Sequence, residues 1–157
     1  LPIGRGAAAG LPDGECWVYR LRADRYFIET APAAEGALCR RLEEQAVRSH
    51  RFVTPTDVTH GWAEICVVGQ KSRELLSKLC GLNLEAAADY PDGTAVETSV
   101  AKIYQLVIRR DLGPVPAYFL VGARSLGAYL WDALMQAGRE WSIGTVGLSS
   151  VGWWRPP

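Results

Sequence analysis

Hydrophobic and polar positions follow a regular pattern after a short lead-in. The runs 16–22 and 25–30 are rich in aromatic and β-branched side chains, and a two-residue link separates them. Two β-prone runs with such a link are typical of a tight hairpin. Residues 1–14 are instead rich in glycine and proline and show no period, so we predict a flexible lead-in there.

Two helices and two further strands are predicted in the middle of the chain. Apolar side chains recur at every fourth position within 32–47, which predicts a helix with one apolar face. A second helix is predicted over 70–80, ended by Gly81. The segments 51–58 and 61–68 between them are β-prone and are predicted to be strands.

The second half of the chain predicts three strands and a last helix at 125–141, which has the clearest amphipathic signal in the sequence. The strands are expected at 95–101, 103–110 and 116–121. Strand pairs that alternate with helices indicate an α+β fold, a ferredoxin-like sandwich with a mixed or antiparallel sheet. The expected core consists of Tyr26, Ile28, Leu38, Leu42, Ile65, Leu75, Leu79, Leu106, Ile108, Leu130 and Leu134.

The composition fits one folded domain. The chain has 157 residues, 48% of them hydrophobic, and this length buries enough surface to fold without disulfides or a metal. Its 17 lysines and arginines balance 17 aspartates and glutamates, which argues against a binder of nucleic acid or of anionic membranes. Its apolar runs are far shorter than the roughly 20 residues that span a bilayer.

The cysteines are Cys16, Cys39, Cys66 and Cys80, and no two of them form a C-x-x-C pair. A zinc or redox motif is therefore a weak interpretation. No secretory signal precedes them, so we expect reduced, mostly buried thiols in a cytoplasmic protein.

Few residues suggest chemistry. Asp57 and His60 lie in a short connection between two predicted strands and could form an acid/base pair. Both residue types are also common in turns, which is the interpretation we favour. The sequence has no P-loop, no G-x-G-x-x-G after a strand and no H-E-x-x-H, and we expect no metal site.

The segment 149–157 shows no hydrophobic periodicity but contains two adjacent tryptophans. Trp153, Trp154 and Arg155 lie beyond the last predicted helix. Tryptophan and arginine are enriched where proteins bind one another, so we predict that this aromatic tail contacts a partner chain.

Several phrases, taken in order, resemble the aminomethyltransferase superfamily. They are LRADRYFI at 21–28, TDVT at 56–59, WAEI at 62–65, VGQKSRELL at 68–76, FLV at 119–121, Arg124 with Ser125, YLWDAL at 129–134 and AGRE at 137–140. Within that superfamily, the phrase CGLNL at 80–84 and the turn at 91–93 are similar to those of sarcosine oxidase gamma subunits. The resemblance covers residues 15–148.

The resemblance implies an aminomethyltransferase-type folate-binding domain fold. Aminomethyltransferases bind tetrahydrofolate in a ring of three domains, of which this chain matches only a portion. Sarcosine oxidase gamma subunits are accessory chains, and their larger partner subunits hold flavins, a dinucleotide and the folate site. The implied role is a non-catalytic subunit, without its own cofactor, of a complex that oxidises a secondary amine and transfers the one-carbon unit to tetrahydrofolate.

The resemblance also points to one carboxylate. When the phrase at Trp17-Val18-Tyr19 is aligned, the functional aspartate of the family falls at Glu15, or at Gly14 if the register shifts by one. Glutamate is one methylene longer, and a misplacement of about an ångström can cost a hundredfold in rate, so Glu15 and Asp57 are weak catalytic candidates. The alternatives are a stand-alone tetrahydrofolate-binding protein that self-associates to complete its pocket, and an interaction domain without chemistry.

Overall fold

The computed structural model describes residues 1–11, 14–84 and 89–147. The strands are β1 (Arg5–Leu11), β2 (Gly14–Arg20), β3 (Tyr26–Thr30), β4 (Trp62–Val68), β5 (Ala95–Val100), β6 (Ile103–Arg109) and β7 (Ala117–Ala123). The α-helices are α1 (Glu35–Arg48), α2 (Ser72–Ser77) and α3 (Gly127–Ala137), and 3₁₀ turns at Arg124–Leu126 and Arg139–Trp141 flank α3. All three predicted helices are present, each shorter than its apolar pattern suggested.

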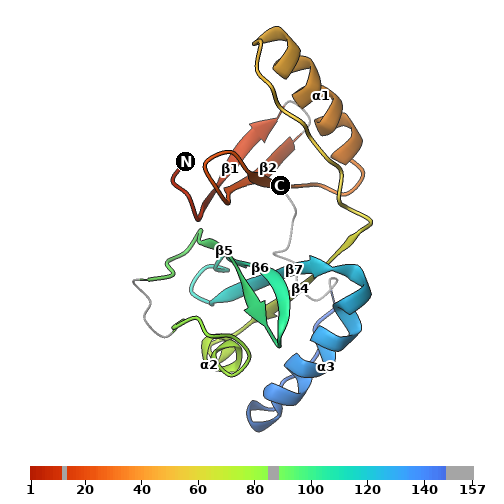
Figure 1. Ribbon diagram of the computed structural model, residues 1–157. Coiled ribbons are helices and arrows are strands. Elements are labelled where there is room, and N and C mark those ends of the chain that lie inside the picture. Colours follow the sequence, from red (N-terminus) through yellow and green to blue (C-terminus); the bar gives the residue numbers. More distant parts are fainter. Residues whose placement is uncertain (12–13, 85–88, 148–157) are drawn as a thin grey trace.

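The strands form two antiparallel sheets. One sheet has the order β1-β2-β3 and the other has the order β4-β7-β6-β5. Figure 1 shows the first sheet in the upper half of the view with α1 above it, and the second in the lower half with α2 and α3 below it. The predicted α+β class and hairpin are confirmed, and β3 and β4 each lie at the edge of a sheet.

Helices α2 and α3 cover one face of the four-stranded sheet. Leu130 and Leu134 of α3 are each 3% exposed, because their four-residue spacing turns both side chains to the sheet. The buried residues of this cluster are Val67, Leu75, Leu76, Leu84, Val100, Val107, Tyr118, Leu120, Leu130 and Leu134. The prediction of a core helix near the end of the chain is confirmed.

The opposite face of the four-stranded sheet packs against the three-stranded sheet. Successive side chains of a strand point to opposite faces, so each strand of the larger sheet serves both clusters. Tyr19 lies at the centre of this second cluster with 0% exposure. The buried residues are Tyr19, Ala95, Leu106, Ile108, Ala117, Phe119 and Val121.

The flexible lead-in predicted for residues 1–14 is wrong in its main part, because β1 pairs with β2 along its whole length. Gly6 makes this pairing possible. A Cβ at position 6 would lie 2.2 Å from Cδ1 of Tyr19, so the ring occupies the space that a side chain would need. Glycine and alanine carry no alternating pattern, and the sequence therefore gave no sign of a strand.

Backbone hydrogen bonds of the described residues join the two sheets along the side where β1 and β5 lie. The Gly6 amide donates to the Gly93 carbonyl at 2.8 Å, and the Ala95 amide donates to the Gly4 carbonyl at 2.9 Å. Arg5 adds a side-chain hydrogen bond to Thr94 Oγ1 at 3.0 Å. These bonds link β1 to the start of β5, whereas the other side of the sandwich, where β3 and β4 lie, stays open.

The predicted strand at 51–58 is wrong. These residues have no regular structure, and Phe52 is fully exposed. Pro55 has no N–H to donate to a ladder, and no strand of the described chain lies alongside as a partner. The segment instead runs from α1 to β4 as an irregular connection.

Some side chains assigned to the core are at the surface. Tyr26 is 50% exposed, because it begins an edge strand and points away from the cluster that Phe27 joins. Ile28, Leu38, Leu42, Ile65 and Leu79 are only half-buried. Of the thiols expected to be mostly buried, Cys16 is buried and Cys66 is exposed.

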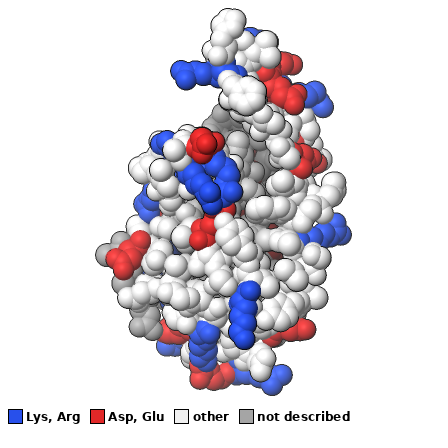
Figure 2. Space-filling view, in the orientation of Figure 1, with Lys and Arg blue, Asp and Glu red and all other residues white. Residues whose placement is uncertain are grey.

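The exterior carries both signs of charge. Figure 2 shows lysines and arginines interspersed with aspartates and glutamates over the face in view, with no extended surface of one sign. No helix of the described chain is long and apolar enough to cross a membrane.

Candidate functional site

A large groove opens between the two sheets on the side where β3 and β4 lie, opposite the backbone bonds between β1 and β5. Its volume is about 1070 Å³. Its walls come from β3, the first half of α1, the connection 54–60 and the start of β4, and residues of the larger sheet form its floor. Apolar and aromatic side chains predominate, among them Trp17, Phe27, Leu38, Leu42 and Trp62.

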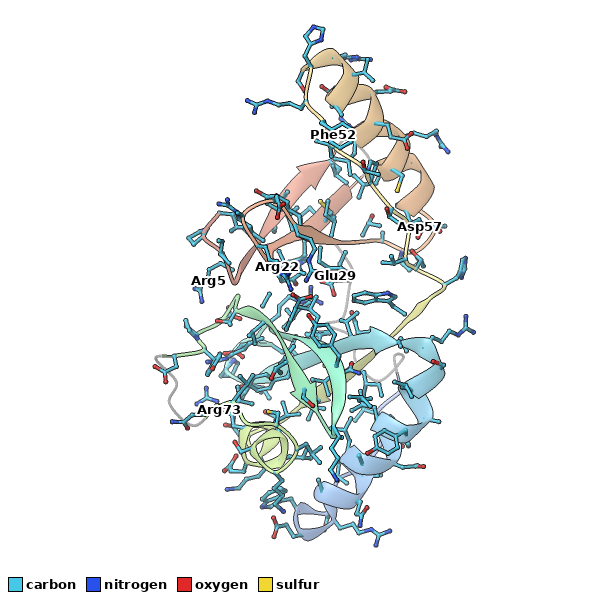
Figure 3. The ribbon with its side chains drawn as sticks, viewed as in Figure 1. Arg5, Arg22, Glu29, Phe52, Asp57 and Arg73 are labelled. Carbon is cyan, nitrogen blue, oxygen red and sulfur yellow. The ribbon has the colours of Figure 1, made fainter. Side chains whose placement is uncertain are left out.

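Arg110 is the central polar residue of the floor. It directly follows β6, and its Nη1 donates to Tyr19 Oη at 2.9 Å and to Glu29 Oε2 at 2.6 Å. The Tyr19 hydroxyl donates to the same Glu29 oxygen at 2.9 Å. This arrangement connects β2 and β3 of one sheet to the other sheet, and Figure 3 shows Glu29 projecting into the space between the two.

Aromatic rings surround the Arg110 guanidinium. Its Cζ lies 4.2 Å from the ring centroid of Phe119 and 5.1 Å from that of Trp17. Phe27 and Trp62 stack nearby, with ring centroids 5.6 Å apart. Arg110 and Glu29 are each 16% exposed, so this ion pair is shielded from much of the solvent screening that weakens surface pairs.

Glu64 of β4 lies beside this pair without a cation of its own. The pKa of Glu64 is raised to about 8 by burial first and then by a hydrogen bond with Glu29 and the negative charge of Glu29, against the effect of Arg110. By its accessible surface Glu64 is an exposed residue on the wall of the groove. The neighbouring Glu29 carboxylate therefore favours the protonated form of Glu64.

Asp57 and His60 lie on the rim of the groove. Asp57 Oδ1 accepts a 2.9 Å hydrogen bond from the Thr59 amide, and the pKa of the Asp57 carboxyl is lowered by the Thr59 side chain first and by this backbone bond second. No hydrogen bond or ion pair joins Asp57 to His60 in the described chain. The turn interpretation explains both residues, and Figure 3 shows Asp57 on the connection that leads into β4.

Glu15 lies apart from the groove. It is exposed near the start of β2, opposite Gly10 of β1, and it does not line the groove. The tail residues Trp153, Trp154 and Arg155 lie outside the described part of the chain. The described residues hold no group of three or more side chains suited to a metal ion.

The sequence did not single out the residues that the fold brings together here. Glu29, Glu64 and Arg110 come from three segments 35 or more positions apart, and from the sequence none of them was given a role in a site. One signal was available, since Glu64 interrupts the apolar run from Ala63 to Val68. A carboxylate within such a strand faces either solvent or a polar site, and sequence alone does not distinguish them.

The arrangement can bind and orient a molecule, and it can hold or release a proton at Glu64. It offers two paired side chains, Glu29 and Arg110, and a wall of aromatic rings. Burial also raises the pKa of the Cys16 thiol, so this cysteine is not an activated nucleophile.

Comparison with known proteins places the chain near sarcosine oxidases. It is 25% identical over 161 residues to sarcosine oxidase subunit alpha of Rhizobium meliloti (strain 1021), covering 96% of this chain and 16% of the relative. It is 28% identical over 139 residues to that of Corynebacterium sp. (strain P-1), covering 84% and 14%. The chain thus spans less than a fifth of the length of these curated relatives.

Among solved structures, the chain is similar to one from the heterotetrameric sarcosine oxidase of Corynebacterium sp. U-96 in complex with pyrrole 2-carboxylate. The TM-score is 0.67 with 22% identity, covering 93% of this chain and 70% of that chain. The aminomethyltransferase-type domain fold is therefore confirmed. A sequence profile, that of the GCVT N-terminal domain, matches residues 7–155, and the chain belongs to this family.

Proposed function

We propose that this chain is a small accessory subunit, similar to the gamma subunit, of a heteromeric sarcosine-oxidase-like flavin complex. The larger subunits of such a complex would oxidise a secondary amine and transfer its one-carbon unit to tetrahydrofolate. Flavin and tetrahydrofolate would be bound by those partners, and this chain would stabilise the assembly. The four free cysteines are consistent with a reducing compartment, which we propose to be the cytoplasm.

The main support for this proposal is that the chain covers a small share of an alpha subunit but most of the matched chain in a solved structure. The chain covers only 16% of an alpha subunit but 70% of the chain that it matches in a heterotetrameric sarcosine oxidase. That matched chain must be several times shorter than an alpha subunit. A short chain with this fold inside such an assembly supports a subunit of similar size and role here.

The side chains of the described residues also favour a non-catalytic role. Glu15 is isolated at the surface, and Asp57 is bonded to the backbone of its own turn. The polar residues of the floor are paired with one another across the two sheets and so contribute to the structure. We expect the isolated chain to show no amine oxidation, and Glu15→Gln to behave as the native chain does.

The proposal is tested by reconstitution. The chain is co-expressed with the larger subunits of a heterotetrameric sarcosine oxidase that lack their own small subunit, and the mixture is separated by size. Co-elution of the chain with flavin absorbance, and greater thermal stability of the complex than without it, would support the proposal. Amine oxidation by the chain alone would contradict it, as would failure to co-elute in any combination.

The size of the groove favours a second candidate, a tetrahydrofolate-binding protein. A volume of about 1070 Å³ with aromatic walls is at the upper end of what small-molecule sites need. Titration calorimetry of the isolated chain with tetrahydrofolate tests it. Heat that disappears in a Trp62→Ala variant would favour this candidate over the accessory role, and absence of heat would exclude it for the isolated chain.

A further inference from the structure

The open edge of β3 is the first feature that the fold leaves without an explanation. All five residues of β3 line the groove. Their backbone pairs with β2 on one side, and the described chain offers no backbone hydrogen bond to them on the other. Such an edge is a template for another strand, and proteins commonly cover it.

The charges of the groove are the second feature. Six carboxylates line it, and three of these have cations: Glu29 has Arg110, Glu97 has Arg22 and Arg25, and Asp111 has Arg109. The other three, Glu35, Asp57 and Glu64, have no ion-pair partner among the described residues. The two arginines that line the groove, Arg25 and Arg110, are both already paired.

The apolar face of α1 is the third feature. Leu38 and Leu42 line the groove and stay half-exposed, and Ala46 is the one buried residue of the helix. Tyr26 and Tyr104, at 50% and 59% exposure, line it as well. The groove therefore combines an open strand edge, apolar walls and carboxyl groups that have no ion-pair partner among the described residues.

We infer that the groove is the docking site for an extended, positively charged segment of a partner subunit, which pairs with the free edge of β3. Strand addition provides backbone hydrogen bonds, and alternate side chains of the added segment enter the pockets beside the edge. Its apolar side chains would pack against α1, and its lysines or arginines would face Asp57 and Glu64. The identity of the partner as a subunit of the same complex rests on the proposed function.

The raised pKa of Glu64 is consistent with a positively charged segment as the ligand of the groove. Its pKa is raised to about 8 because burial and Glu29 oppose its negative charge. A cation placed beside it would reverse that effect and stabilise the carboxylate. A folate would instead bring its own carboxylates into a groove that also holds Glu35 and Asp57, which is electrostatically unfavourable.

Peptides test the groove directly. The probe is acetyl-Val-Lys-Val-Lys-Val-amide, and the comparison is the same peptide with glutamate in place of lysine, each titrated into the full chain by calorimetry. We expect the lysine peptide alone to bind, and an N-methylated form that cannot pair with a strand to lose binding. Equal binding of all three peptides, or binding of none, would overturn the inference, as would methylammonium competing at the same concentration as the lysine peptide.

Matched charge reversals locate the site. Asp57→Lys changes an unpaired carboxylate on the rim, and Glu43→Lys changes an exposed carboxylate of α1 that does not line the groove. We expect Asp57→Lys to weaken binding of the lysine peptide about tenfold or more and Glu43→Lys to leave it unchanged. Glu64→Gln serves as a second variant, with a smaller loss. Equal losses for Asp57→Lys and Glu43→Lys would contradict docking in the groove.

The same variants separate this inference from the proposed function. If the native chain and Asp57→Lys co-elute equally well with the larger subunits, the groove is not the docking site and the accessory role stands. If the native chain binds the lysine peptide but never co-elutes, the docking site stands and the accessory role falls.

Discussion

Helices α3 and α1 carry the same kind of amphipathic signal and have different surroundings. On α3 the apolar face is buried against the four-stranded sheet, and Leu130 and Leu134 are 3% exposed. On α1 only Ala46 is buried, Val47 is 76% exposed, and the helix packs closely on no other described helix or strand. An apolar face indicates that a helix needs a partner surface, but it does not say that the partner lies in the same chain.

The largest expected loss of stability comes from a substitution in the core between α3 and the four-stranded sheet. Leu130→Ala leaves a cavity between α3 and the sheet and should lower the free energy of unfolding by roughly 2 to 5 kcal/mol. Leu42→Ala on α1 should cost less than about 1 kcal/mol, because the side chain is already half-exposed. Urea denaturation of both variants measures the difference. Equal losses would mean that α1 is as well packed as α3.

The next effect concerns the connection between the sheets. Arg110→Met removes the hydrogen bonds to Tyr19 and Glu29 and leaves the Glu29 carboxylate without its cation. The expected loss is roughly 1 to 3 kcal/mol, below that of a fully buried pair because solvent still reaches the groove. Arg124→Met, a change of the same kind at an exposed arginine, is the control and should be nearly neutral. Denaturation midpoints compare the two.

Folding stability should depend on pH through Glu64, which lies in the groove between the sheets. Glu64 holds its proton in the folded chain up to about pH 8, whereas a free glutamate loses it near 4.5. The folded state thus binds more protons between these values, so its stability is complete below pH 4.5 and declines as the pH rises to 8. The groups that face Glu64 are Glu29, Arg110 and Cys66.

The measurement is the melting temperature of the native chain minus that of Glu64→Gln, followed from pH 5 to pH 9. The difference should become more negative up to about pH 8 and then stay constant. A flat difference would show that Glu64 titrates like a free carboxyl and that neither burial nor Glu29 affects it.

The smallest effect on folding is expected from the C-terminal tail. Deletion of 149–157, with Trp153, Trp154 and Arg155, should change the melting temperature little while it weakens co-elution with partner subunits. The reason is that aromatic and arginine anchors concentrate binding energy at interfaces. A sharp fall in melting temperature with intact co-elution would instead place the tail in the core of this domain.

Secondary structure was predicted best from the sequence where a single chain segment determines it. The hairpin of β2 and β3 follows from two β-prone runs with a short link, and α3 follows from its leucine spacing. The fold class followed from the order of such elements. Resemblance to the aminomethyltransferases added the family and the domain fold, which periodicity alone does not supply.

Prediction from the sequence failed where a strand depends on a neighbouring strand that is distant in the chain. Residues 51–58 have a strand-like composition but no neighbouring strand to pair with, whereas β1 has little apolar pattern and pairs because β2 offers an edge and Gly6 accommodates the Tyr19 ring. A β-strand is stabilised by its neighbours, which are distant in sequence. Helices are stabilised by local hydrogen bonds and so were easier to predict.

The chain itself therefore determined its α+β class, its three helices and the absence of the common nucleophile and phosphate-binding motifs. Only the tertiary structure decided that Glu29, Glu64 and Arg110 meet at one groove, because packing two sheets face to face brings together residues that no local spacing relates. Tertiary structure also decided that β1 is bonded to the start of β5, and that the edge of β3 and the apolar face of α1 remain uncovered by the described chain. The backbone bonds at Gly4 and Gly6 join the sheets at the edge of β1 and β5, and the groove opens on the side of β3 and β4.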